Sequence, residues 1–335
     1  MKTPKLYHLV AYTSFIVSFT ANSLLIYLAR TRRLDRLGAY KHLITCFAFA
    51  SIFYSTCDVI YQPVIIAKTG GHITFCSSPY GLGSSAEYVG ALFAVNYGNT
   101  LLLIALHYVY RYFAVSKNHL LHYFNGKKLM TWLSVILVLD FLWFIGALFL
   151  FRKTPTTDEY LRSDFETLYE ADVGNVSYLA VLFKTEVNGQ SIYLSDSIIM
   201  TVVIVFQQTL TLMVIGACGY RTYKSIRKFP ISTMTRNLQK KLFKMLLVQT
   251  GSPLVLMYFS IVVLIIAPFF GFTVGKNSIF ISCALAVYPA TEPLIILYFL
   301  SEFRQNTRHP MVHSLGSRVV STSVSVHPVR VSSLS

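Results

Sequence analysis

The residues with the clearest potential for chemistry lie near the end of the chain, in the sequence YPATEPLIILYFLSEFRQ at 288–305. Pro289 and Pro293 flank the carboxylate of Glu292 inside an apolar run long enough to cross a bilayer as a helix. Each proline removes a backbone donor, which leaves the carbonyls of Leu285 and Pro289 without their helical partners. Free carbonyls and an ionisable group are costly in hydrocarbon, so we expect them to contact other protein or water. This run is therefore predicted to be a working segment of a helix bundle.

Other polar side chains give little support for catalysis. Asp58, Asp140 and Glu292 lie inside apolar runs, where an acid is either functional or a protonated carboxyl bonded to a neighbouring helix. His107 is the only histidine well within such a run, and no nucleophile–base pair or GxSxG motif accompanies it. The five cysteines do not have the spacing of metal ligands. We therefore expect no enzyme activity, no cofactor and no metal site.

Composition indicates an integral membrane protein. Of the 335 residues, 54% are hydrophobic and only 13% are charged, against about 25% charged in a typical soluble domain. The formal net charge of +15 would suit nucleic acid if the basic residues gathered on one soluble face. They are instead distributed between apolar runs, which indicates a lipid bilayer and no nucleic-acid partner.

Apolar runs of about 20 residues or more define an all-α fold, a bundle of seven transmembrane helices. The predicted spans are 6–29, 42–67, 86–113, 129–151, 192–218, 245–270 and 278–300. The segments on one side of these spans hold 21 Lys and Arg residues, and those on the other side hold 8. The positive-inside rule then places the N-terminus outside and the C-terminus in the cytoplasm. Residues 1–300 form the helical domain, and 301–335 are predicted to be a disordered cytoplasmic tail.

The segments between spans offer further sites. Residues 152–194 are acidic and contain the sequon Asn175-Val176-Ser177, which an outward-facing loop exposes to glycosylation. The inner segment 221–244 carries eight basic residues and no acid. It suits either lipid headgroups or an acidic protein partner.

Four stretches occur together in one family. RLDRLGAYKHLI and FYSTCDVIYQPVI within 33–66, LHYVYRYFAV at 106–115, and YPATEPLIILYFLSEFR at 288–304 resemble the Str-type (Str and Srj) seven-transmembrane serpentine chemoreceptors of nematodes. The resemblance implies a G-protein-coupled receptor that serves olfaction, binds a small environmental chemical and works in the sensory cilia of chemosensory neurons. That family usually has Asp where this chain has Glu292. A rhodopsin-like disulfide to the second outer loop cannot form, because 152–194 contain no cysteine.

A receptor of this kind is a two-state bundle in which ligand shifts the population, so three groups of residues are predicted to act. Tyr110-Arg111-Tyr112 takes the place of the Arg-centred motif of rhodopsin-like receptors. The predicted ligand pocket is lined by Tyr88, Asn96, Tyr97, Phe206, Gln207, Tyr258, Phe259, Phe280 and Cys283. The predicted G-protein contacts are Arg111, Tyr112, Lys224, Arg227, Lys228, Lys240, Lys241 and Arg304.

The conformational switch is assigned to Pro253, Pro289, Glu292 and Pro293. At about 1.5 Å per residue, Glu292 lies roughly 12 Å from the inner end of its helix, away from the expected pocket. This depth favours a hinge over ligand contact. The alternative function is a ligand-gated channel or transporter, since proline-broken helices with buried carboxylates also mark ion paths. No internal repeat pairs two broken helices in this chain, which disfavours a transporter.

Overall fold

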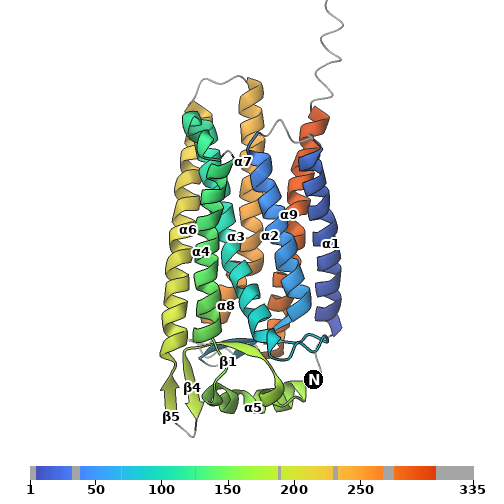
Figure 1. The fold of residues 1–335 in the computed structure, drawn as a ribbon, viewed down its shortest axis with the longest axis vertical. Coiled ribbons are helices and arrows are strands. Elements are labelled where there is room, and N and C mark those ends of the chain that lie inside the picture. Colours follow the sequence, from blue (N-terminus) through green and yellow to red (C-terminus); the bar gives the residue numbers. More distant parts are fainter. Residues whose placement is uncertain are drawn as a thin grey trace, which may run out of the picture.

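The computed structural model describes residues 5–31, 38–68, 70–124, 126–187, 190–228, 233–266 and 275–306. Within these ranges seven helical segments are long and apolar enough to cross a membrane, as predicted, and they form one bundle (Figure 1). They are α1 (Lys5–Arg30), α2 (Tyr40–Tyr61), α3 (Ser85–Ser116), α4 (Lys127–Leu150), α6 (Ser195–Lys228), α7 with α8 (Thr233–Pro253 and Phe259–Ile266) and α9 (Ile279–Asn306). Helix α9 continues to Asn306, so the first six residues of the predicted tail 301–335 are helical; the rest, 307–335, lie outside the described residues.

Several span boundaries differ from the prediction. Helix α6 runs to Lys228, where the fifth span was expected to end at residue 218, and α7 begins at Thr233, where the sixth was expected to begin at residue 245. The second span was expected to run to residue 67, but α2 ends at Tyr61 and residues Pro63–Lys68 form strand β1. Gln62 takes a left-handed conformation (φ 50°), and Pro63 has no N–H to continue a helix. The fifth span starts only at Ser195, because Gln190–Tyr193 form strand β5. An apolar strand and an apolar helix end have the same hydropathy, so composition alone cannot separate them.

Helix α3 is the central helix of the bundle, and two glycines allow its neighbours to approach closely. A Cβ at Gly98 would lie 3.0 Å from the indole of Trp143 in α4. A Cβ at Gly219 in α6 would lie 3.0 Å from the Tyr108 ring of α3. Small residues are the usual means of close helix packing in membranes, where lipid supplies no hydrophobic drive between helices.

The sixth span changes its helical type midway. Pro253 ends α7, residues Leu254–Tyr258 form a π-helical turn, and α8 continues from Phe259. Pro253 removes one helical hydrogen bond, and a π turn widens the backbone locally. Both features are common where a helix bends. In α9 the helix continues through Pro289 and Pro293.

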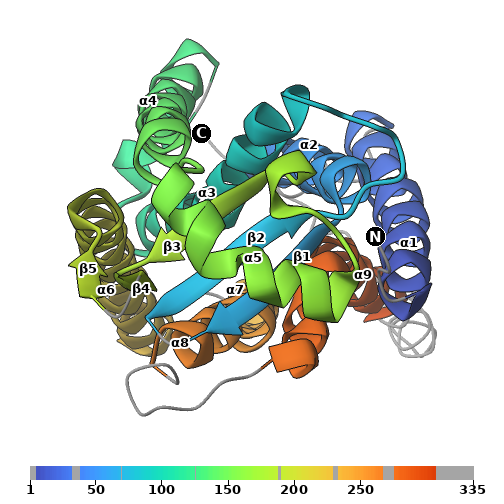
Figure 2. The same cartoon turned by 90° about the horizontal axis from the view of Figure 1, so that it is seen from below.

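A small sheet covers one end of the bundle, which we call the capped end; the opposite end is the open end (Figure 1). Strands β1 (Pro63–Lys68), β2 (Gly71–Cys76) and β3 (Tyr178–Leu182) pair antiparallel in the order β1-β2-β3. Helix α5 (Pro155–Tyr169) lies across the sheet, seen from this end in Figure 2. The hairpin β4 (Lys184–Val187) and β5 (Gln190–Tyr193) leads into α6. Short 3-10 turns occupy Asn118–Phe124, Val173–Asn175 and Gly275–Ser278.

Both faces of the sheet are buried. Side chains alternate between the two faces along a strand, and each face packs against a different part of the protein. Ile65 and Ala67 of β1 pack into the bundle, against Tyr54 and its neighbours. Val64 and Ile66 pack in the other direction, in a cluster with Phe165 of α5. This apolar packing joins the segments after α2 and α4 into one cap. A sheet covered on both faces explains why the strand residues read as an uninterrupted apolar run.

His72 of β2 makes the stability of this cap dependent on pH. It pairs with Ala67 across the ladder, is buried, and its Nδ1 has no hydrogen-bond partner in the described structure. Desolvation lowers the pKa of His72 to about 4. An unfolded histidine titrates near about 6.5, so between these values the unfolded chain binds a proton that the folded chain does not. The free energy of unfolding therefore falls as pH drops from about 6.5 toward 4.

We expect His72→Phe to remove that contribution, so that the mutant loses less thermal stability than wild type between pH 7 and pH 5. Thermal unfolding of the purified protein at both pH values measures the difference. His119→Gln, in the exposed part of a 3-10 turn, serves as the control and should keep the wild-type pH dependence. An identical pH dependence in His72→Phe and wild type would show that His72 is not the titrating group.

Candidate functional site

Aromatic side chains form a cluster on the bundle side of the sheet. Tyr54 of α2 stacks on Phe93 of α3 with ring centroids 5.5 Å apart. Tyr97 of α3 and Tyr258 lie with ring centroids 4.7 Å apart, and the Tyr258 hydroxyl donates to the Tyr97 carbonyl at 3.0 Å. Tyr288 of α9 packs against Tyr54 in the same cluster. Aromatic walls with a few polar groups are typical of sites for small, largely apolar ligands.

A small cavity with both apolar and polar lining residues adjoins this cluster; we call it the polar cavity after Ser51, Asn96, Asn99 and Thr100, which reach it. Its volume of about 10 Å³ is the room of roughly one water molecule. The Oδ1 atom of Asn99 is buried without a hydrogen-bond partner in the described structure. A bound water is the simplest group that satisfies it. The cavity is lined by Phe47, Ala50, Ser51, Tyr54, Asn96, Asn99, Thr100, Leu103 and Tyr288.

Glu292 of α9 lies next to this cavity and is fully buried. Its Oε1 accepts from the Tyr288 hydroxyl at 3.3 Å, and its Oε2 accepts from Nε2 of Gln249 in α7 at 3.1 Å. Ser252 and Thr291 join the same two helices through their hydroxyls, 2.6 Å apart. The three switch residues of α9 and Pro253 of α7 therefore lie where these two helices are held together by polar contacts.

The carbonyl freed by Pro289 has the kind of partner that the sequence predicts. The Tyr54 hydroxyl donates to the Leu285 carbonyl at 3.4 Å, across from α2 to α9. Tyr54 also lines the polar cavity. The Leu285 carbonyl, which Pro289 leaves without a helical partner, thus links the aromatic cluster to the helix that carries Glu292.

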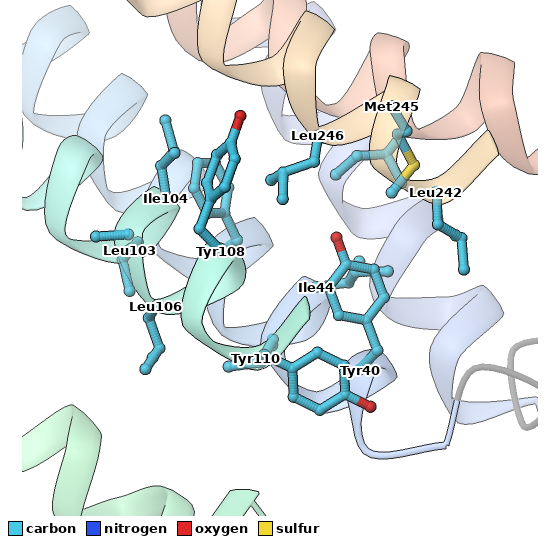
Figure 3. Packing of buried hydrophobic residues seen from close by; sticks show 14 of the residues in the cluster. Tyr40, Ile44, Leu103, Ile104, Leu106, Tyr108, Tyr110, Leu242, Met245 and Leu246 are labelled. Carbon is cyan, nitrogen blue, oxygen red and sulfur yellow. The ribbon is translucent and has the colours of Figure 1, made fainter. Parts of the chain in front are cut away.

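Arg111 lies near the open end of α3 and is 3% exposed. Its guanidinium carbon lies 3.8 Å from the centroid of the Tyr40 ring of α2, a cation–π geometry. Tyr40 in turn stacks on Tyr110 with ring centroids 5.4 Å apart. Figure 3 shows these two rings side by side, in the cluster that also contains Leu242 and Met245 of α7. The Nε and Nη2 atoms of Arg111 have no hydrogen-bond partner among the described residues.

The other predicted G-protein contacts gather toward the same open end. Tyr112 is half-buried beside Arg111, and its ring lies 5.8 Å from the guanidinium of Arg221. The predicted lysines and arginines of α6 and α7 are exposed, apart from the half-buried Lys241; they are Lys224, Arg227, Lys228, Lys240 and Lys241. Arg304 belongs to the last turn of α9. The open end is therefore basic around a buried arginine.

The structure corrects four of the nine predicted ligand contacts. Tyr88, Phe206, Phe259 and Phe280 are 57–66% exposed and point away from the bundle interior. A helix in lipid is apolar on every face, so the sequence does not reveal its rotation about its axis. The remaining residues lie inward. Asn96 lines the cavity, Tyr97 and Tyr258 belong to the aromatic cluster, Gln207 accepts from the Trp143 indole, and Cys283 is half-buried near Tyr7.

Several residues of the candidate site were assigned no role from the sequence. Tyr288 and Gln249, which bind Glu292, and Tyr40, which holds Arg111, are the clearest examples. Tyr288 stands four residues before Glu292, a spacing that places both side chains on one helix face. That spacing is a usable signal. Tyr40 gave none, because only the packing of α2 on α3 brings it to Arg111.

The comparisons with known proteins agree with this architecture. Residues 7–308 match the family model described as "Serpentine type 7TM GPCR chemoreceptor Str". The chain belongs to the Str family of serpentine receptors. Among its relatives are the proteins named serpentine receptor class r-10 of Caenorhabditis briggsae, 31% identical over 87% of this chain and 86% of that protein, and of Caenorhabditis elegans, 31% identical over 86% of each. The C. elegans protein named G-protein coupled receptor str-33 is 27% identical over 88% of both chains.

Squid rhodopsin shares the fold of this Str-family receptor. The two structures superpose with a TM-score of 0.58 over 94% of this chain and 88% of the rhodopsin chain, at 12% sequence identity. The chain is thus a multi-pass membrane protein with the architecture of a G-protein-coupled receptor, and its family is one of receptors rather than enzymes.

Proposed function

We propose that this receptor binds a small environmental chemical at its capped end and activates a heterotrimeric G protein at its open end. The observation that carries the proposal is the hydrogen-bonded chain Tyr288–Glu292–Gln249. Tyr288 lines the cavity at the aromatic cluster, and Gln249 belongs to the helix whose other half reaches the basic open end. A ligand that moves Tyr288 therefore changes how α9 holds α7, which biases a two-state bundle.

The proposed orientation places the capped end outside and the open end in the cytoplasm. The distribution of Lys and Arg between the spans supports it. In that orientation Asn175, which is exposed in the cap, is a glycosylation acceptor. Its side-chain amide donates to Asp172 at 3.1 Å, so the transferase must first break this bond. We place the receptor in the plasma membrane of sensory cilia on chemosensory neurons, where an olfactory receptor meets its cue.

The direct test is expression in a reporter cell with a heterotrimeric G protein, challenged with a panel of volatile and soluble compounds. A compound that raises calcium or cyclic nucleotide only in cells with the receptor supports the proposal. A ligand-gated channel is the competing function. Ligand-evoked current in a bilayer that contains this protein alone would replace the G-protein proposal with that one.

A further inference from the structure

Three buried polar side chains meet at the capped end of α1 and α2, outside the aromatic cluster. Tyr7 is 0% exposed, Asp58 is 2% exposed and Gln62 is 0% exposed. The Tyr7 hydroxyl is close enough to the Asp58 carboxyl to act on it as a hydrogen-bond donor. Yet the Tyr7 hydroxyl, Asp58 Oδ1 and Gln62 Nε2 all have no hydrogen-bond partner of standard geometry in the described structure. We call these three residues the Asp58 cluster.

Such a group is costly to leave unsatisfied. A buried polar atom without a partner costs about 1–3 kcal/mol, and more when it is charged. The buried Asp58 carboxyl, next to two further groups without hydrogen bonds of standard geometry, favours a partner that brings hydrogen-bond donors. The described residues place no Lys or Arg nitrogen within 4.0 Å of Asp58, so this carboxyl also lacks a counter-ion from the chain. The partner must therefore come from outside the described chain.

The chemistry of the cluster fits a small ammonium group. A carboxylate and a phenol oxygen accept from ammonium donors, and the walls near Asp58 include the ring of Tyr54. Gln62 is held by His8, whose Nδ1 lies 2.5 Å from Oε1. Because an imidazole nitrogen can act as donor or acceptor, the Gln62 amide can flip, give its NH₂ to His8 and turn its oxygen toward the ammonium. The three side chains then supply three acceptors for the three donors of a primary ammonium.

The cap adds a second, independent preference for cations. Helix α5 carries four acids and a single basic residue, Arg162. Its apolar face packs in the same cluster as Tyr7, through Leu161, Phe165 and Tyr169. An acidic element next to a buried carboxyl raises the local concentration of cations and their rate of arrival. A metal ion is the weaker fit, because the described residues form no group of three His, Cys, Asp or Glu side chains that could hold one.

We propose that the Asp58 cluster is a binding site for a small primary amine in its ammonium form. The amine stabilises the packing of α1 on α2 by donating hydrogen bonds to Asp58, Tyr7 and Gln62. Tyr54 lies beside Asp58 and also lines the polar cavity next to Glu292, so the bound amine contacts the elements that carry the proposed signal. The inference that amines are the sensed chemicals rests on the proposed receptor function. The inference that the Asp58 cluster binds an amine does not depend on that function.

The test uses the purified receptor in lipid nanodiscs at pH 7 and constant ionic strength. Methylammonium chloride is titrated while thermal unfolding is followed, with tetramethylammonium chloride and ethanol as probes that lack N–H donors or charge. We expect methylammonium alone to raise the unfolding temperature saturably. Asp58→Asn should weaken its apparent affinity at least about tenfold, since a charged hydrogen bond is lost. Asp140→Asn, a matched acid substitution in α4, should bind as wild type.

Tyr7→Phe keeps the ring and removes one acceptor, so it provides a milder second variant in case Asp58→Asn does not fold. We expect it to weaken methylammonium binding about three- to tenfold. Equal stabilisation by ethanol, or none by methylammonium, would overturn the site. So would wild-type affinity in Asp58→Asn or, where that variant does not fold, in Tyr7→Phe. A receptor that binds methylammonium but evokes no G-protein response in reporter cells would refute the proposed signalling and leave the amine site standing.

Discussion

Arg111→Ala is expected to abolish ligand-evoked G-protein signalling while surface expression stays at the wild-type level. Arg111 is buried, its guanidinium carbon lies 3.8 Å from the Tyr40 ring centroid, and its Nε and Nη2 have no hydrogen-bond partner among the described residues. These donors are available to the carbonyl or carboxylate of a partner segment once the open end widens. Folding should tolerate the substitution, because it removes a buried charge whose donors are unsatisfied. Surface labelling beside a calcium or cyclic-nucleotide readout measures both quantities.

The Tyr40 ring provides matched controls for this result. A cation–π contact is worth about 0.5–2 kcal/mol, so removing the ring with Tyr40→Leu should free Arg111 and raise basal signalling several-fold. Tyr40→Phe keeps the ring and its cation–π contact with Arg111, so it should stay closer to wild-type signalling than Tyr40→Leu although it loses the hydroxyl that interacts with Arg111. Unchanged signalling in Arg111→Ala would remove this arginine from the mechanism.

Glu292→Gln is expected to change basal and maximal coupling and to leave ligand affinity nearly unchanged. The glutamine keeps the size of the side chain but replaces one acceptor oxygen by a donor, so it cannot accept from both Gln249 and Tyr288. Leaving one of these buried partners unsatisfied costs about 1–3 kcal/mol. A coupling energy of that size shifts a two-state equilibrium by about five- to 150-fold. Full concentration–response curves separate maximal response from affinity.

Gln249→Leu breaks the same contact from the α7 side. If the two side chains act together, the double variant Glu292→Gln with Gln249→Leu should lose no more coupling than either single variant. Asp140→Asn controls for the loss of an acid elsewhere in the membrane. Altered affinity with intact maximal coupling in Glu292→Gln would count against a hinge and in favour of direct ligand contact.

Hydropathy was enough to predict the seven helices, because each needs a long apolar run. It could not predict β1, since residues 63–67 are as apolar as the helix before them and only Pro63 marks the change. That Glu292 and the carbonyls freed by the two prolines have protein partners was predictable for a different reason. A proline and an acid are so costly in a membrane that they require partners, although the sequence does not say which ones.

The rotation of each helix about its own axis was the main feature that the sequence did not predict. Phe206 and Phe280 looked like pocket residues but face outward, whereas Tyr288 and Tyr40 face inward. In a soluble protein the polar face of a helix would have separated these sets. Here both faces are apolar, and only the packing of one helix on another distinguishes them.

The sheet at the capped end also affects how the protein can be handled. All five cysteines are free, and β3 reaches β2 through a ladder of backbone hydrogen bonds and apolar contacts. The segments after α2 and α4 are therefore joined without any bond that a reducing agent can break. We expect dithiothreitol to leave the cap intact, so that the receptor can be produced in a reducing host and purified in the presence of thiols.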